Sequence, residues 1–153
     1  MENRNGLVVA AEATLATGTA EREAAAAFSE RLPEGATLGA DKNYDAEAFV
    51  EGLKARKIEP HVAINGTVSK TGKVRKTAVP GEVAASLRYA IGQRLRKRIE
   101  ECFGWSKTVA GLAQVKVRGL DKVRAAFVFG ISAYNLVRLP KLLAPTGEVC
   151  PVR

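Results

Sequence analysis

Two short apolar segments, separated by about one helix of chain, most limit how this sequence can fold. Residues 36–40 (ATLGA) and 58–64 (IEPHVAI) have the length and apolar character of buried strands. The first segment ends at Asp41, so the predicted strand delivers a carboxylate at its C-terminal end. Helical segments before and between the strands give an alternating order, which predicts an α/β fold with parallel pairing.

The helices of this region are predicted from composition and periodicity. Residues 19–31 are rich in Ala and Glu, which favour helix, and Pro33 should end this helix. A second helix is expected at about residues 46–56, with Asp45 as its N-cap. Its apolar positions share one predicted face: Phe49, Val50 and Leu53.

The flanking regions extend this plan. Residues 6–17 are predicted to form a strand or hairpin. A long helix is expected at about residues 82–103, and its predicted core stripe recurs every four positions at Leu87, Ile91, Leu95 and Ile99. A final helix at about residues 120–139 should end at Pro140. Its apolar stretch, residues 125–137, is too short to span a bilayer and indicates a buried helix.

Charge is distributed unevenly along the chain. Residues 1–65 carry 7 Lys and Arg against 11 Asp and Glu, a net charge of −4, whereas residues 66–153 carry 17 against 5, a net charge of +12. Residues 66–80 hold four basic residues and no acidic one, which indicates a mobile basic surface loop or a linker without a ligand. The basic half indicates either a polyanionic partner or a merely solvated surface.

The rarer residues exclude several classes of protein. Two cysteines, Cys102 and Cys150, form neither a disulfide framework nor a zinc motif. The one histidine, His61, leaves little for Ser-His-Asp or Cys-His catalysis. The N-terminal residues lack a basic segment followed by an apolar one, so a cytoplasmic protein without a membrane partner is expected.

The candidate chemical residues lie in two segments. Asp41, in LGADKNYD, follows a predicted strand, where α/β folds place ligand-binding groups; alternatively, its carboxylate caps the next turn. Glu100, in RLRKRIEECFGWSK, lies one helical turn after Arg96 and two turns before Lys107, and Phe103 shares this predicted face. Such a carboxylate could bind a divalent metal while the cations bind phosphates. Equally, Glu100 could be a salt-bridge partner of Arg96.

Taken together, the segments resemble the DDE transposase domain of bacterial insertion sequences. The similarity lies in MENRNGLVV, GTAEREAA, ADKNYD, QRLRKRIEECFGWSKT and AYNLVRLPKLLA, which keep the family's order. The resemblance implies a partial ribonuclease-H-like fold, with a mixed sheet flanked by helices and a long C-terminal helical part. Residues 1–144 would be the C-terminal part of the catalytic domain, and residues 145–153 a flexible tail. Asn135 and Arg138, in the last segment, are expected to pack a helix rather than to perform chemistry.

The resemblance also assigns roles to particular residues. Asp41 matches the second aspartate of the family's acidic triad and Glu100 its glutamate, which implies that both are catalytic and metal-binding. Arg96, Glu100 and Lys107 fit the arginine–x3–glutamate–x6–lysine signature, whose usual preceding tyrosine is Gln93 here. The residues expected to bind DNA are Lys42, Lys73, Arg75, Lys76, Arg94, Arg96, Lys97 and Lys107.

The chain departs from the family pattern in two respects. The signature tyrosine is absent, and Tyr89, one turn earlier, is the candidate substitute. No residue before Asp41 matches the first aspartate of the triad, because Glu2 and Glu12 do not follow suitable strands. The chain is therefore expected to be an incomplete catalytic domain, and the missing strand would leave a sheet edge that favours self-association.

The implied activity is metal-dependent cleavage and strand transfer of DNA. Two Mg²⁺ or Mn²⁺ ions would activate the attacking oxygen and stabilise the leaving oxygen, while Arg96 and Lys107 bind phosphates. The implied partner is double-stranded DNA, both transposon ends and target. Because one carboxylate is missing, the chain is expected to be inactive alone. The alternative function is that of a non-catalytic DNA-binding remnant or regulator.

Overall fold

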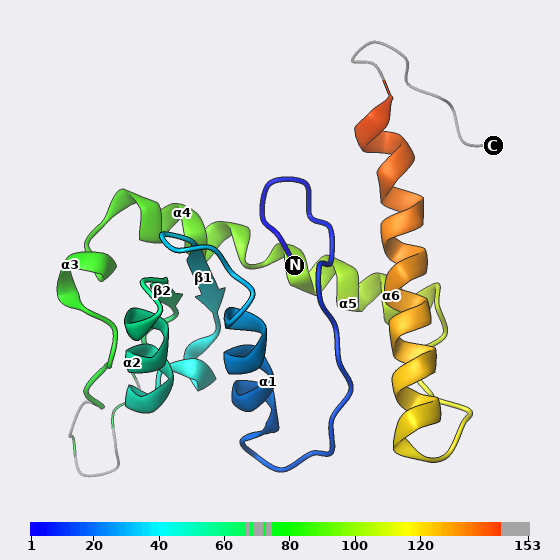
Figure 1. Cartoon of the computed structure of the whole chain (residues 1–153), viewed down its shortest axis with the longest axis horizontal. Helices are drawn as coiled ribbons and strands as arrows, with labels where there is room; N and C mark the ends of the chain where they lie inside the picture. The colour runs from blue at the N-terminus through cyan, green and yellow to red at the C-terminus, as the bar shows by residue number, and fades with distance from the viewer. Residues whose placement is uncertain (67, 69–71, 73–74, 145–153) are drawn as a thin grey trace. The chain divides into compact units, whose positions relative to one another are not determined.

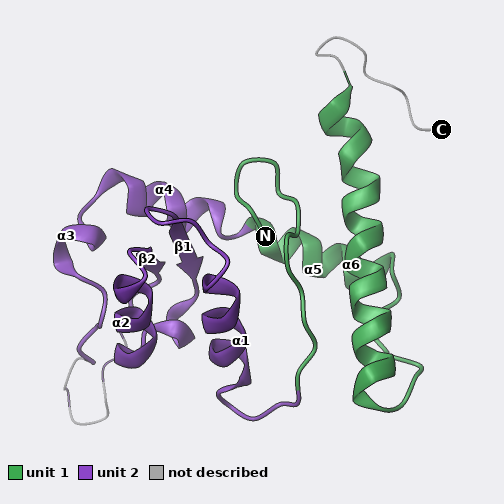
Figure 2. Ribbon diagram, viewed as in Figure 1, with its two compact units in different colours: residues 1–14, 98–153 green, residues 15–97 purple. Residues whose placement is uncertain are grey.

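The computed structural model describes residues 1–66, 68, 72 and 75–144. Its helices and strands are shown in Figure 1. The chain divides into two compact units (Figure 2): unit 2 comprises residues 15–97, and unit 1 comprises residues 1–14 and 98–153. The predicted DNA-binding residue Lys73 and the predicted tail lie outside the described residues.

Unit 2 is built around two parallel strands. Strand β1 (Thr37–Ala40) pairs with β2 (Glu59–Val62), so that Ala40 lies opposite Val62. Helix α2 (Glu47–Ala55) forms the crossover between them, and α1 (Ala20–Ser29) precedes β1. The predicted positions of these strands and helices and the parallel pairing are therefore confirmed. The expectation that the first strand is buried is wrong, because the residues of β1 alternate between exposed and half-buried, whereas β2 is mostly buried. The apolar core consists of Phe49, Val50, Leu53, Ile58, Val62 and Val79.

The sheet of the described residues contains only this parallel pair, so the expectation of a mixed sheet is wrong for this part of the chain. Two pairing strands and their crossover helix are compatible with the α/β class. The ribonuclease-H-like fold remains a prediction.

The predicted long helix at residues 82–103 is instead divided among three helices: α3 (Gly81–Ala84), α4 (Leu87–Leu95) and α5 (Arg98–Thr108). The predicted core stripe is also wrong, because Leu87 is 76% exposed and Ile91 is 47% exposed. Helix α4 instead contacts β2 through a polar face. The interactions of that face with the strand backbone decide which side of the helix is buried.

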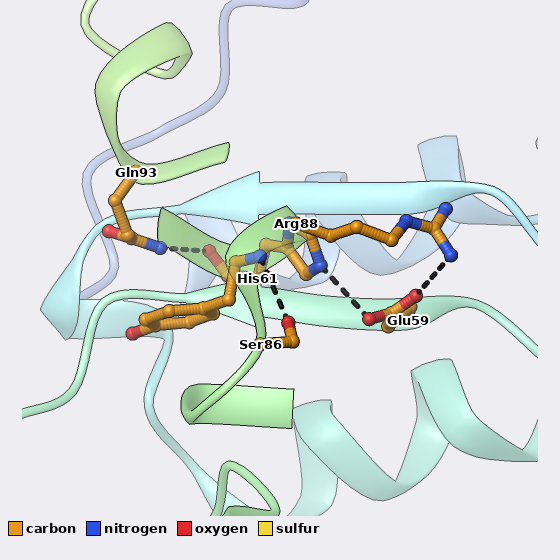
Figure 3. A network of polar contacts seen from close by, with 6 residues as sticks. Glu59, His61, Ser86, Arg88 and Gln93 are labelled. Atoms are coloured by element: carbon orange, nitrogen blue, oxygen red, sulfur yellow. Dashed lines mark hydrogen bonds and ion pairs between the residues drawn. The ribbon is translucent and has the colours of Figure 1, made fainter. Parts of the chain in front are cut away.

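Three residues of α4 determine how this helix packs against β2. The Tyr89 hydroxyl donates to the carbonyl of Val62 at 2.8 Å, and Gln93 Nε2 donates to the carbonyl of His61 at 2.6 Å. The latter bond and the surrounding polar network are visible in Figure 3. Gly92 lies against the His61 ring, where a Cβ would overlap Nδ1. A larger residue at position 92 would therefore push α4 away from the strand.

Asp45 does not cap α2, as its sequence position predicted. The N-cap position is occupied by Ala46, and no side chain caps the helix. The buried Asp45 carboxylate accepts hydrogen bonds from Asn65 N at 2.9 Å, Ala78 N at 2.8 Å and Thr77 Oγ1 at 3.1 Å. A buried carboxylate requires several donors, and these two later segments supply three.

Unit 1 pairs α5 with α6 (Leu120–Leu143) and holds the N-terminal residues. Residues 6–14, within the predicted strand or hairpin, are not a strand in this unit. The Asn135 side chain takes the place of a strand partner: its amide accepts from Val8 N at 2.9 Å and donates to Val8 O at 2.8 Å. Arg138 donates to the carbonyl of Asn5. The predicted packing role of Asn135 and Arg138 therefore consists of holding this segment.

The C-terminal helix differs from its prediction in two ways. Pro140 lies inside α6 and does not end it. The apolar stretch at 125–137 is not a buried helix, since Phe129 is 79% exposed and Leu136 is 67% exposed. Its buried residues are Gly130, Ile131 and Tyr134. Among the described residues, no helix is both long and apolar enough to cross a membrane.

We expect Gly92→Ala to destabilise the protein, because the added methyl group would overlap the His61 ring. Overpacking of this kind costs about 1–3 kcal/mol in the free energy of unfolding, which urea titration measures. Gly104→Ala in α5 is the matched control, since nothing lies within 4 Å of its added Cβ. The control should stabilise by about 0.4–1 kcal/mol. Equal effects of the two substitutions would contradict the close packing of α4 on β2.

Candidate nucleic-acid and metal site

Asp41 lies immediately after β1, at the carboxyl edge of the parallel pair. Its side chain is exposed, and Oδ1 accepts a hydrogen bond from Asn43 N at 2.7 Å. This bond caps the short 3-10 helix η1 (Lys42–Tyr44), as the alternative interpretation of Asp41 predicted. The second oxygen makes no hydrogen bond to any residue that the structure describes, so capping leaves one oxygen for a ligand. The metal-binding role of Asp41 remains a prediction.

A polar recess opens beside this edge of the sheet, and we call it the sheet-end pocket. Its volume is about 260 Å³. The residues that line it come from α1, η1 and the segments that follow β2: Gly18, Glu21, Arg22, Lys42, Asn43, Tyr44, Asn65 and Arg75. Two of the cations predicted to bind DNA, Lys42 and Arg75, thus line one pocket.

Arg22 and Glu21 of this pocket were not among the residues predicted from the sequence. Both lie in GTAEREAA, a segment that the resemblance included without assigning a role to any residue. Their position in the first turn of α1 places them beside η1, where Arg22 contacts the carbonyl of Asn43 at 3.5 Å. The only available signal was that the helix beginning there precedes the strand that ends at Asp41.

Charges around Tyr44 define the electrostatics of the sheet-end pocket. Partial burial raises the pKa of Tyr44, and the negative charges of Glu21 and Asp41 raise it further. The positive charge of Arg22 acts in the opposite direction. Both carboxylates and the guanidinium are therefore close enough to act on one phenol group.

Gln93, which stands at the position of the signature tyrosine, binds Arg96. Arg96 is the C-cap of α4, and its Nε donates a hydrogen bond to Gln93 Oε1 at 2.9 Å. Because Gln93 also donates to the carbonyl of His61, one amide connects Arg96 to β2. Tyr89, the candidate substitute, uses its hydroxyl to bind the carbonyl of Val62. The connection to Arg96 is therefore made by Gln93.

Glu100 and Lys107 lie in the same helix, α5, and both are exposed. Their spacing of seven residues places them on one face of this helix. Arg96 lies outside α5 and belongs to unit 2, so the predicted common helix face of Arg96, Glu100 and Phe103 is wrong. The regular helix is interrupted by a turn at residues 96–97, the last two residues of unit 2.

The signature lysine, Lys107, lies at a second pocket, within unit 1. Lys107 lines a mainly apolar pocket of about 260 Å³ together with Glu12 and Phe103. The carboxylate of Glu12 pairs with Arg124 at 3.2 Å, so Glu12 already has a partner within unit 1.

The remaining predicted DNA-binding residues of the described chain, Lys76, Arg94 and Lys97, are exposed in unit 2.

The two predicted metal ligands have the chemistry that a hard divalent cation requires. Asp41 and Glu100 are exposed carboxylates, and no ion pair of the described residues occupies either one. No group of three or more His, Cys, Asp or Glu side chains is placed to hold a metal within the described ranges. Asp41 belongs to unit 2 and Glu100 to unit 1, so the metal-binding role that the resemblance assigns to both carboxylates remains a prediction.

Comparison with known families identifies the class of this protein. The transposase DDE domain matches residues 1–136, which is most of the chain. The chain therefore belongs to the transposase DDE domain family, and its function is related to DNA transposition. Members of this family generally use divalent metal ions and act on DNA. No curated protein and no solved structure matches the chain.

The charges around Tyr44 lead to a prediction about its ionisation. Glu21→Gln should lower the pKa of Tyr44, and Arg22→Gln should raise it, because the two side chains act on the phenolate with opposite sign. The ultraviolet absorption of ionised tyrosine measures both changes, and Tyr44→Phe identifies the signal. Glu23→Gln, on the same helix but outside the pocket, should have little effect. An unchanged pKa in Glu21→Gln would exclude Glu21 from the neighbourhood of Tyr44.

Proposed function

We propose that this chain contributes the second aspartate and the glutamate of a DDE-type site for cleavage and strand transfer of DNA. The observation that carries the proposal is the position of Asp41 in a chain of this family. Its exposed carboxylate directly follows a strand of the parallel pair, and cations line the adjacent pocket. Ligands of α/β proteins commonly bind at this edge of a parallel sheet.

In this mechanism, Asp41 and Glu100 are the protein ligands of Mg²⁺ or Mn²⁺, and the bound cation would stabilise negative charge at the scissile phosphate. Arg96 provides a guanidinium whose orientation is fixed by Gln93, so it can donate to a phosphate oxygen with little loss of side-chain entropy. Lys107 lies two turns from Glu100 on the same helix and supplies a second phosphate contact.

Two carboxylates do not provide enough ligands for a metal pair, so we propose that this chain is catalytically incomplete alone. We therefore expect no strand transfer by the 153-residue chain with either cation. A second function, DNA binding without catalysis, is favoured by one observation: the Asp41 carboxylate already caps η1. Metal binding by Asp41 distinguishes the two functions.

If Asp41 and Glu100 share a metal site, their substitutions should not be additive. We expect Asp41→Asn and Glu100→Gln each to weaken Mn²⁺ binding by about tenfold or more, which is about 1.4 kcal/mol. The double substitution should be little worse than either single one, because each removes the same site. Electron paramagnetic resonance of free Mn²⁺ measures all four affinities.

Glu101→Gln is the matched control, because Glu101 is the adjacent exposed glutamate of α5. It should retain the affinity of the unmodified protein. Additive losses from the two single substitutions would indicate two separate sites. A protein that binds no Mn²⁺ at all would support the non-catalytic DNA-binding function instead.

Binding of duplex DNA should depend steeply on salt and little on sequence. The exposed cations supply phosphate contacts, and each contact contributes about 0.9 to the slope of log affinity against log salt. We expect Lys76→Gln and Lys97→Gln each to reduce this slope by about that amount. Lys54→Gln is the control, since this lysine already pairs with Glu51 at 2.8 Å. An affinity that barely changes between low and physiological salt would contradict the electrostatic account.

A further inference from the structure

Three cations line the sheet-end pocket, and they form no ion pair among the described residues, as is also true of several other cations of unit 2. Elsewhere in unit 2, ion pairs join Lys54 to Glu51, Arg56 to Glu30, Lys57 to Glu34 and Arg88 to Glu59. None of the ion pairs among the described residues involves Arg22, Lys42 or Arg75. The protein thus gathers three cations without carboxylate partners around one recess, and such an arrangement favours a bound anion.

The charge of the pocket lining limits what this anion can be. Arg22, Lys42 and Arg75 contribute three positive charges to the lining and Glu21 one negative charge. The Asp41 carboxylate lies next to the lining and also acts on Tyr44, so the net charge around the recess is +1 with Asp41 included. A phosphate monoester carries a charge of about −1.5 to −2 at neutral pH, whereas an internal phosphodiester carries only about −1. The excess of positive charge favours an anion, and a phosphate monoester, which carries the larger negative charge, is attracted more strongly than a link within a continuous strand.

Other features of the pocket favour the same group. The Tyr44 hydroxyl and the side-chain amide of Asn43 add uncharged donors to the lining. The first turn of α1, a helix of ten residues, contributes Glu21 and Arg22, so the N-terminal end of this helix, where its macrodipole is positive, lies at the recess. The volume of about 260 Å³ is small for a ligand site, and a recess accommodates the end of a strand more easily than a strand continuing in both directions.

We propose that the sheet-end pocket is a binding site for a phosphate monoester, held by Arg22, Lys42 and Arg75. Two sources share this chemistry: the 5′-phosphate at an end of DNA, and free inorganic phosphate. The first source rests on the proposed function, since it requires that the protein acts on DNA. The second does not.

The test compares four probes with the full chain. Fluorescence anisotropy measures the affinity for a duplex oligonucleotide with a 5′-phosphate and for the same duplex with a 5′-hydroxyl. Covalently closed circular DNA, which has no ends, and inorganic phosphate serve as competitors. We expect the phosphorylated duplex to bind about tenfold more tightly than the unphosphorylated one, and inorganic phosphate to remove this preference.

The location of the site is tested with variants. Arg22→Gln and Arg75→Gln should each abolish most of the preference for the 5′-phosphate. Arg31→Gln should retain it, since Arg31 is an exposed arginine of the same unit that does not line the pocket. Lys42→Gln, outside the regular helices and strands that hold the core, provides a third variant if Arg22→Gln fails to fold.

Each outcome has one meaning. Equal affinity for the two duplexes, with no competition by inorganic phosphate, would overturn the proposal even if circular DNA binds, and would leave the proposed DNA-binding function intact. Binding of inorganic phosphate to the full chain, measured directly by isothermal titration calorimetry, without binding of any DNA would support the pocket and contradict the proposed function. A preference that survives in Arg22→Gln and Arg75→Gln would place the phosphate elsewhere and overturn the assignment of this pocket.

Discussion

The parallel pairing of β1 with β2 is the interaction on which the candidate site depends. Backbone bonds from Glu59 N to Ala36 O and from Ala63 N to Ala40 O, both 2.9 Å, fix the register. This pairing makes both strands end at one edge, so the residues that follow them meet there. Asp45 secures the arrangement, because its buried carboxylate binds the chain beyond β2 at two places. The sheet-end pocket lies where these segments converge.

A second group of contacts connects β2 to Arg96, one residue of the signature. Through Tyr89 and Gln93, helix α4 binds carbonyl groups of the strand, in addition to its contacts with the side chains of Glu59 and His61. Gln93 then orients the guanidinium of Arg96. In unit 1, Asn135 binds both backbone groups of Val8 in a comparable way. In both units, a side-chain amide therefore makes hydrogen bonds to backbone groups that would bond to a neighbouring strand in a wider sheet.

The errors of prediction have a common cause. Leu87 and Ile91 recur at the spacing of a core stripe, yet the polar bonds of Tyr89 and Gln93 turn that stripe toward solvent. Residues 6–14 have β-forming composition but find no partner strand, and a side chain of α6 satisfies Val8 instead. Local propensity is a weak guide where long-range hydrogen bonds choose the buried face.

The sequence by itself determined the strands, the helices α1 and α2, and the family to which the chain belongs, because these depend on local periodicity and on ordered motifs. It also indicated Asp41 as a strand-end carboxylate. Only the tertiary structure decided that Arg22 joins Lys42 and Arg75 at one pocket. It also decided that Gln93, rather than Tyr89, connects Arg96 to β2. These relations join residues far apart in the chain, or depend on which face of a helix meets a strand, and neither property is encoded in residue spacing alone.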